Sequence, residues 1–378
     1  MIRTVARATQ WWYERAVKPV LFRWDPETVH DHALQFGAWI GAHPRLREMV
    51  AHGYAYHHPA LTQELAGITF PAPIGLAAGF DKNARLLEIL PAVGFGFAEI
   101  GSVTAVPCAG NPKPRLWRLP ESGALQVYYG LANDGAAIIA ERLRRRALCI
   151  PIGVSVAKTN APSTAARAAG IADMVAGMRA VQGVGSYCTL NVSCPNAFGG
   201  TPFSDDSDAL DELLQETDAL RSAVPVFLKL PCDSTAEEFD ALLAVADRHA
   251  VAGVIISNLT KDPQYPGIAV ADRARLQRGG ISGKPVAQRA NAHIARTYAR
   301  YRDRFVIVGC GGVFTVDDAY EKIRCGASLV QLITGMIYQG PSLIGQLHRG
   351  LVERLHREGF ASIRDAVGSG VAGIHSSS

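Results

Sequence analysis

Eight short apolar runs, rich in β-branched residues, recur along the chain from residue 74 onward. They are IGLAA (74–78), FAEIGSV (97–103), IGVSVA (152–157), YCTLNVS (187–193), VFLKL (226–230), GVIISNL (253–259), FVIVGCG (305–311) and LVQLITG (329–335). Helical patterns lie between most of them, for example over residues 208–223 and 235–250. Continuous apolar strands that alternate with helices indicate a parallel sheet whose outer face is covered. Eight such repeats favour a closed α/β barrel, the (β/α)8 or TIM-barrel fold, over an open doubly wound sheet.

The first part of the chain does not follow this alternation. Residues 1–60 are expected to form a small N-terminal helical appendage with a turn within residues 41–49, and residues 61–378 the barrel domain. Residues 1–24 hold five basic side chains against one acidic one, which accounts for the whole net charge of +4, and they also hold Trp11, Trp12, Tyr13, Phe22 and Trp24. Basic and aromatic residues interleaved in this way are typical of a helix on an anionic membrane surface. A helix docked on its own domain fits the composition equally well.

Other features of the composition exclude whole classes of protein. No basic stripe continues beyond residue 24, which disfavours nucleic-acid binding. The seven cysteines form no CxxC pair and have no ligand-like spacing with histidine, so we expect no metal site and a reduced, intracellular protein. No secretory signal is evident, and no apolar run approaches the ~18 residues of a membrane span.

A barrel of this kind requires its catalytic groups at the carboxyl ends of several strands. The predicted ends carry Gly79–Lys82, Ser102, Ser155 with Lys158, Asn191–Asn196, Lys229, Asn258, Gly311–Gly312 and Thr334–Gly335. Polar residues or glycines at all eight ends are hard to explain by solubility alone. The pattern therefore predicts a functional face at this end of the barrel.

Three glycine-rich motifs surround the seventh and eighth strands: GGISGKP (279–285), VGCGG (308–312) and LITGM (332–336). In this fold such loops form a phosphate site, because exposed backbone N–H groups face the anion. Tight turns that need positive φ would explain each motif alone. Together, on adjacent strands, they favour a phosphate-bearing cofactor. No GxGxxG motif follows a first strand, so we expect no Rossmann dinucleotide site.

Two lysines are candidate ligand contacts. Lys229 lies inside the apolar run VFLKL, where its charge needs a negative partner, and an electron-rich flavin ring would supply one. An internal salt bridge is the alternative, but Asp81 is the one acidic residue at the predicted strand ends, so the sequence favours a ligand. Lys82 follows a glycine-bounded turn and suits an anionic substrate.

Several of these motifs resemble the dihydroorotate dehydrogenases, in particular the class 2, quinone-linked, membrane-associated branch. They include FRWDPETVHDHA (22–33), GLAAGFDKNA (75–84), GFGFAEIGSVT (94–104), GNPKPRLWRLP (110–120), NVSCPN (191–196), GGISGKP (279–285), GCGG (309–312) and GASLVQLITG (326–335), and the similarity runs nearly the full length. The DPExxH segment is typical of class 2 only. The resemblance implies an FMN-containing barrel in pyrimidine biosynthesis. It also implies N-terminal helices that sit on the membrane and guide quinone to the flavin.

The resemblance also implies roles for individual residues. FMN would be held by Ala78, Gly79, Ser102, Asn191, Lys229, Ser257, Gly283, Gly312, Thr334 and Gly335. Dihydroorotate, which loses a proton from C5 and a hydride from C6, would contact Lys82, Asn191, Asn196 and Asn258. His30 and Arg118 would border the quinone passage. The protein would be a peripheral membrane protein, on the cytoplasmic face of the inner membrane if it is bacterial.

The chain departs from the class 2 pattern at the catalytic base. Cys194 stands where class 2 enzymes usually have serine, as in the class 1 enzymes. A thiol has a reference pKa of about 8.5, so the thiolate is accessible near neutral pH. We therefore expect Cys194 to be the general base, and the side chain of Ser193 to point the other way on an extended segment.

Further departures fall at the expected substrate and cofactor contacts. The usual asparagine, aromatic, threonine, asparagine and tyrosine are replaced by Val127, Leu131, Leu259, Ser155 and Ile333 respectively. Each substrate group left without a partner costs about 1–3 kcal/mol. Three alternatives therefore stay open. The protein could be a paralogue that acts on a different, less polar cyclic substrate, or Tyr128 or Tyr129 could replace the lost substrate contacts. It could also be a peripheral membrane protein without turnover.

Overall fold

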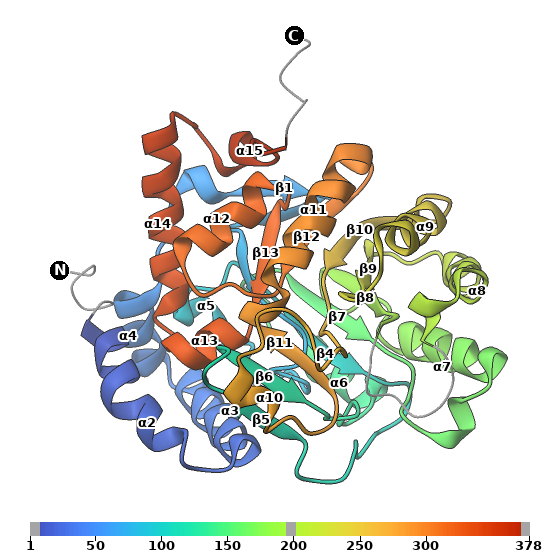
Figure 1. The fold of residues 1–378 in the computed structure, drawn as a ribbon, viewed down its shortest axis with the longest axis horizontal. Coiled ribbons are helices and arrows are strands. Elements are labelled where there is room, and N and C mark those ends of the chain that lie inside the picture. Colours follow the sequence, from blue (N-terminus) through green and yellow to red (C-terminus); the bar gives the residue numbers. More distant parts are fainter. Residues whose placement is uncertain (1–7, 194–201, 372–378) are drawn as a thin grey trace.

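The computed structural model describes residues 8–193 and 202–371. Its centre is a closed barrel of eight parallel strands, in the order β3 (Ile74–Leu76), β4 (Phe97–Val103), β7 (Ile152–Val156), β8 (Tyr187–Asn191), β9 (Val226–Leu230), β10 (Val251–Ile256), β12 (Val306–Cys310) and β13 (Leu329–Leu332). β13 pairs with β3, with Gln331 opposite Gly75, which closes the barrel. The predicted fold class is confirmed, and each of the eight predicted runs contains or overlaps one barrel strand (Figure 1).

Helices cover the outer face of the barrel. The longer ones are α6 (Ala136–Arg144), α7 (Arg167–Ala180), α8 (Ser207–Asp218), α9 (Ala236–Asp247), α11 (Ala287–Tyr301), α12 (Val316–Arg324) and α14 (Leu343–Glu358). The shorter ones are α5 (Leu90–Val93), α10 (Val270–Arg273), α13 (Thr334–Gln339) and α15 (Ile363–Ala366), with single 3-10 turns at η2 (Pro59–Leu61), η3 (Pro162–Thr164), η4 (Phe203–Asp205) and η5 (Lys284–Val286). α9 begins with a capping box, in which Thr235 and Glu238 each accept a backbone N–H of the other. The two helical patterns singled out in the sequence correspond to α8 and α9.

Aromatic rings fill the amino end of the barrel. Tyr187 stacks on Phe227 with 4.9 Å between ring centroids, and Phe70 packs edge-on against Phe97 at 5.4 Å. Phe70 belongs to a small antiparallel pair, β1 (Gln63–Leu65) and β2 (Ile68–Phe70), that precedes the barrel. Because these rings occupy the amino end, the carboxyl end is left for a ligand site.

A second, three-stranded antiparallel sheet was not predicted from the sequence. It has the order β11 (Gly280–Gly283), β6 (Ala124–Val127) and β5 (Leu116–Leu119). Gly283 has φ +99°, and a Cβ at this position would collide with the carbonyl oxygen of Gly123, so glycine is required for the close approach. This sheet brings Val127 and Ser282 to the carboxyl end of the barrel.

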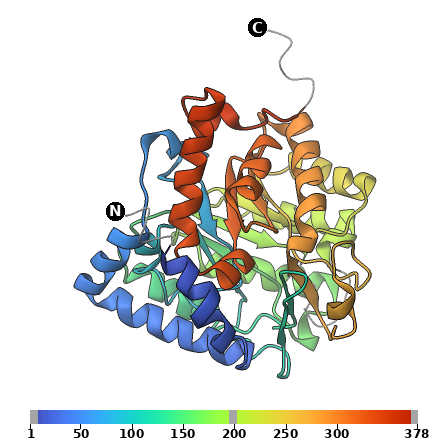
Figure 2. The same ribbon diagram turned by 60° about the vertical axis from the view of Figure 1, so that its left-hand side comes forward.

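The N-terminal helices pack together on one side of the barrel, beside α14 (Figure 2). They are a short π-helix η1 (Tyr13–Val17), α2 (Lys18–Leu21), α3 (Pro26–Ala42) and α4 (Pro44–Tyr54). The turn expected within residues 41–49 consists of His43, between α3 and α4. Asp25 caps α3 by accepting the backbone N–H of Thr28 at 2.8 Å. Among the described residues, no helix is long and apolar enough to span a bilayer.

Candidate active site

A large cavity of about 860 Å³ connects the N-terminal helices with the carboxyl end of the barrel. Trp12, Tyr13 and Phe36 contribute to its outer wall, and Lys229 and Gly312 to its inner wall. The outer part is built largely from apolar side chains of the appendage, and the inner part from the strand ends that the sequence singled out. One continuous space therefore joins the two predicted regions.

Lys229 is buried in the inner wall, with 5% of its surface exposed. It lies in β9 between Asn191 of β8 and Ile255 of β10, which are its partners in register. The charge of Lys229 acts on Glu99 of β4. Glu99 was not predicted, because carboxylates were considered at strand ends and Glu99 lies in the middle of its strand. A charged residue inside the apolar run FAEIGSV was the available signal.

A chain of hydrogen bonds joins polar side chains from three barrel strands and from the loop after β10. The hydroxyls of Ser155 and Ser102 lie 2.8 Å apart, and Asn191 donates its amide N–H to the Ser102 hydroxyl at 2.9 Å. Asn258 in turn donates to the Asn191 carbonyl oxygen at 3.1 Å. The structure thus brings three of the predicted site residues, Ser102, Asn191 and Asn258, into one network. Ser155, where the family usually has asparagine, also takes part in it.

Ser193 is buried and bonded to the barrel wall. Its hydroxyl donates to the backbone oxygen of Lys229 at 3.1 Å and accepts an N–H from Asn258 at 3.0 Å. Cys194 and Asn196, the predicted base and one predicted substrate contact, lie outside the described residues. Their roles stay predictions.

The glycine-rich loops meet at the inner end of the cavity. Gly283, Gly312 and Gly335 each lack room for a side chain, because a Cβ would collide with Gly123, Ala287 or Val313 respectively. The hydroxyls of Ser282 and Thr334 lie 2.9 Å apart and tie two of the loops together. Further predicted cofactor contacts, Ala78, Gly79 and Ser257, line the same cavity.

His30 and Arg118 both line the cavity between its two ends. His30 donates its Nε2 proton to the backbone oxygen of Phe80 at 2.8 Å, and burial, assisted by the charge of Lys82, lowers the pKa of His30 to about 3. The ring is therefore neutral at physiological pH. Arg118 donates to the backbone oxygen of Trp24 at 2.8 Å.

Lys82 lines a second cavity, which is polar and has a volume of about 270 Å³. Its ammonium lies 3.8 Å from the centroid of the Tyr129 ring, and burial lowers the pKa of Lys82 to about 8. His30 and Tyr129 line both cavities. Lys82 therefore lies in a cavity that shares these two side chains with the large cavity lined by Lys229 and Asn258.

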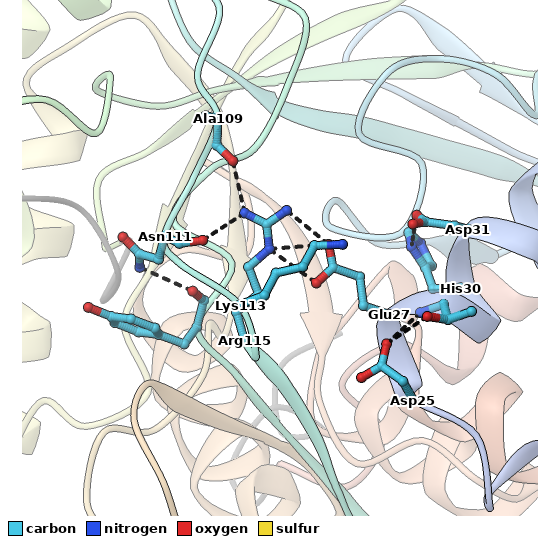
Figure 3. Close-up of polar contacts among 10 residues, drawn as sticks. Asp25, Glu27, His30, Asp31, Ala109, Asn111, Lys113 and Arg115 are labelled. Carbon is cyan, nitrogen blue, oxygen red and sulfur yellow. Dashed lines mark hydrogen bonds and ion pairs between the residues drawn. The ribbon is translucent and has the colours of Figure 1, made fainter.

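A buried ion pair fixes α3 to the barrel (Figure 3). Glu27 accepts from Nε of Arg115 at 3.2 Å and from its Nη2 at 2.8 Å, and Lys113 lies 3.2 Å from the same carboxylate. Arg115 also donates to the backbone oxygens of Ala109 and Asn111 at 2.8 and 2.9 Å. The position of His30 depends on this attachment, since His30 follows Glu27 on the same helix.

Three of the departures from the family pattern lie in the wall of the large cavity: Val127, Leu259 and Ile333. Val127 ends β6, opposite Leu116 and Gly280 in register. The chain thus presents apolar side chains where polar ones were expected.

Comparison with known proteins gives the family. Residues 60–355 match the family described as dihydroorotate dehydrogenase. The chain belongs to this family. Dihydroorotate dehydrogenase (quinone) of Mycobacterium tuberculosis H37Rv is 40% identical over 355 residues, which are 93% of this chain and 97% of the relative. The Corynebacterium efficiens protein of the same name is 38% identical over 363 residues, 95% of this chain and 94% of the relative.

Solved structures of the dihydroorotate dehydrogenase family agree with the fold. The structure of the Eimeria tenella enzyme in complex with ferulenol has a TM-score of 0.80 and 28% sequence identity, and the match covers 91% of this chain and 95% of that one. The ligand-free structure from the same organism has a TM-score of 0.78. The resemblance noted in the sequence is therefore confirmed at the level of the family.

Proposed function

We propose that this protein oxidises dihydroorotate to orotate, with FMN as its cofactor and a quinone as the electron acceptor. The observation that carries the proposal is the cavity that joins an apolar mouth among the N-terminal helices to Lys229 and the glycine-rich loops, in a chain of this family. The quinone-linked names of the relatives support the acceptor. They do not favour the alternatives, a less polar substrate or a protein without turnover.

The inner end of the cavity fits FMN. It combines a buried cation, Lys229, with glycine-rich loops whose residues Gly283, Gly312 and Gly335 line the cavity. When bound, FMN would supply the acceptor for the C6 hydride of the substrate. The residues proposed to hold it are Ala78, Gly79, Ser102, Asn191, Lys229, Ser257, Gly283, Gly312, Thr334 and Gly335.

The chain's own side chains would orient the substrate and take its proton. Asn258 lines the large cavity and donates to Asn191 at 3.1 Å, so each amide holds the other in a fixed orientation. With Lys82 and Asn196 they would bind the polar groups of dihydroorotate. The thiolate of Cys194 would accept the proton from C5. Cys194 follows the proposed Asn191 contact by three positions in the chain.

We further propose that residues 1–60 dock on a membrane surface and admit the quinone past His30 and Arg118. Trp11, Trp12, Val20, Trp24, Phe36 and Trp39 each expose half or more of their surface. Exposed aromatic residues beside basic ones favour the interface of an anionic membrane. The large cavity is lined by residues of the same helices, so quinone could enter from the lipid. In a bacterium this surface would be the cytoplasmic face of the inner membrane.

The activity is tested with FMN-loaded protein in the absence of oxygen. Addition of dihydroorotate should bleach the flavin absorbance, and addition of a soluble quinone should restore it. No bleaching at millimolar dihydroorotate would contradict the proposed substrate. Restoration by oxygen but by no quinone would contradict the proposed acceptor.

Membrane docking is tested by sedimentation with vesicles of anionic phospholipid. Replacing Trp11 and Trp12 together by serine should move most of the protein from the pellet to the supernatant. Val270→Ser, which changes an apolar residue with 83% of its surface exposed on α10, is the matched control and should leave the distribution unchanged. Equal losses in both variants would argue against docking through the appendage.

A further inference from the structure

The side chain of Glu99, on β4, is held inside the barrel by residues of two other strands. Glu99 of β4 accepts hydrogen bonds on Oε2 from the hydroxyl of Thr189 on β8, at 3.0 Å, and from the amide of Gln331 on β13, at 3.2 Å. All three side chains have no exposed surface. Glu99 is therefore fixed in position and shielded from water.

Glu99 and Lys229 belong to the same layer of the barrel interior. Lys229 lies two residues after Phe227, Thr189 two after Tyr187, and Glu99 two after Phe97. Side chains two residues apart on a strand point to the same face. These three polar side chains, with Gln331, therefore form the layer next to the aromatic rings at the amino end of the barrel. Lys229 alone among them lines the large cavity.

The hydroxyl of Tyr187 lies near Glu99 and Gln331 in this region, and within the described part of the chain it forms no hydrogen bond of good geometry with either of them. Burial of a carboxylate is costly unless an opposite charge offsets it. Burial raises the pKa of Glu99, and the charge of Lys229 opposes this rise. Lys229, in the same layer of side chains, is thus the cation whose charge counteracts the effect of burial on this carboxyl group.

We propose that Glu99 is the counter-charge of Lys229 and lowers the reduction potential of the flavin bound against that lysine. The inference rests on the proposed FMN site. A reduced flavin carries more negative charge than an oxidised one, so the cation beside it stabilises the reduced form. Glu99 offsets part of that charge and weakens the stabilisation. A lower potential of bound FMN would favour electron transfer to the quinone. Glu99 acts through Lys229 and is a positioning residue.

The test is the two-electron midpoint potential of bound flavin, measured at one fixed pH against a reference dye. Glu99→Gln keeps the size and the hydrogen-bond acceptor but removes the charge. We expect the equilibrium constant for reduction to rise at least tenfold, which is a shift of about +30 mV for two electrons. Thr189→Val removes a hydrogen bond and no charge, and should shift the constant less than threefold. Glu99→Asp should lie closer to the unaltered protein than Glu99→Gln does.

Each outcome decides between a charge effect and a structural role. A Glu99→Gln protein with a full complement of flavin and an unshifted potential overturns the inference. If Glu99→Gln loses flavin, Glu99→Met removes the same charge and is measured instead. If Glu99→Gln and Glu99→Met both lose flavin and Thr189→Val retains it, Glu99 supports the flavin site and does not set its reduction potential. That outcome also overturns the inference. Failure of the unaltered protein to bind FMN would overturn the proposed function, which is a separate result.

Discussion

Cys194 is the residue on which the proposed proton transfer depends most directly. Replacing it by alanine should lower the rate of flavin reduction by dihydroorotate about 10²- to 10⁴-fold, the usual contribution of a general base. Flavin content should stay unchanged, since the thiol is not a proposed cofactor contact. Rapid-mixing absorbance without oxygen measures the rate.

The pH dependence of the same rate shows whether the thiol acts as its thiolate. The unaltered protein should gain rate as the pH rises toward about 8.5, where a thiol becomes thiolate. Cys194→Ser, which introduces the residue expected at this position in class 2 enzymes, should lose the rise in rate that the thiol causes over that range, because a hydroxyl does not ionise there. Cys149→Ala, at an exposed thiol, is the control and should match the unaltered protein. A rate in Cys194→Ala equal to that of the control would rule out the assigned role.

Val127 tests whether the apolar replacements weaken substrate binding. It lines the large cavity at the end of β6, where the resemblance to the family led us to expect asparagine. Val127→Asn should tighten dihydroorotate binding about 5- to 150-fold, the equivalent of the 1–3 kcal/mol of one restored hydrogen bond. Titration of flavin absorbance with orotate or dihydroorotate gives the dissociation constant. Val127→Thr, which is similar in size to valine, is the comparison. Unchanged binding in Val127→Asn would indicate that another residue, such as Tyr128, already supplies the contact.

At the scale of elements, α3 is held against the barrel by Glu27. Burial would raise the pKa of Glu27, but its hydrogen bonds with Arg115 hold that pKa below the ordinary value, so the carboxylate is charged at neutral pH. Glu27→Ala leaves Arg115 without its partner, and loss of one member of a buried pair costs about 3–5 kcal/mol of unfolding free energy. Urea denaturation measures this loss. We also expect the KM for quinone to rise more than the KM for dihydroorotate, because His30 lies on the same helix.

The control for Glu27 is Glu48→Ala on α4, an exposed residue of the same type, which should change stability by no more than about 0.5 kcal/mol. Replacing Arg115 by methionine together with Glu27→Ala should recover part of the loss, because no unpaired charge then remains. Equal stability of the Glu27 and Glu48 variants would mean that α3 is held mainly by apolar packing.

At the scale of the whole molecule, three buried histidines make stability depend on pH. Burial lowers the pKa of His30 to about 3, of His293 to about 4 and of His348 to about 3. Below about pH 6.5 the unfolded chain binds protons at these positions and the folded protein does not. Stability is therefore complete above pH 6.5 and falls as the pH decreases. Each histidine changes the unfolding free energy by up to about 1.4 kcal/mol per pH unit, so the three together change it by up to about 4 kcal/mol per pH unit.

Urea denaturation at pH 7.5, 6 and 5 checks this dependence. The unfolding free energy should change little between pH 7.5 and 6.5 and fall steeply below it. His348→Gln should reduce the slope between pH 6 and 5 by about a third, since it removes one of the three groups. A slope near zero in the unaltered protein would contradict the assignment of neutral, buried histidines.

Strand positions were predictable because the strands of a parallel barrel are buried on both faces and read as continuous apolar runs. The small sheet of β5, β6 and β11 was not predictable, because its strands are only four residues long. In addition, β6 pairs with β11, which lies about 150 residues further along the chain. Loop motifs predicted the residues of the candidate site, since they need particular residue types. They did not predict that Lys82 and Lys229 line different cavities.

The sequence by itself determined the barrel, the glycine-rich loops and the family, because each is written in local patterns of apolar, glycine and polar residues. Tertiary structure alone decided which distant groups meet. Glu27 reaches Arg115 across 88 positions, and Glu99 reaches Gln331 across 232. Such contacts depend on the register at which the barrel closes and on the direction of each side chain. Both are set by the packing of all eight strands together, which no local stretch of sequence contains.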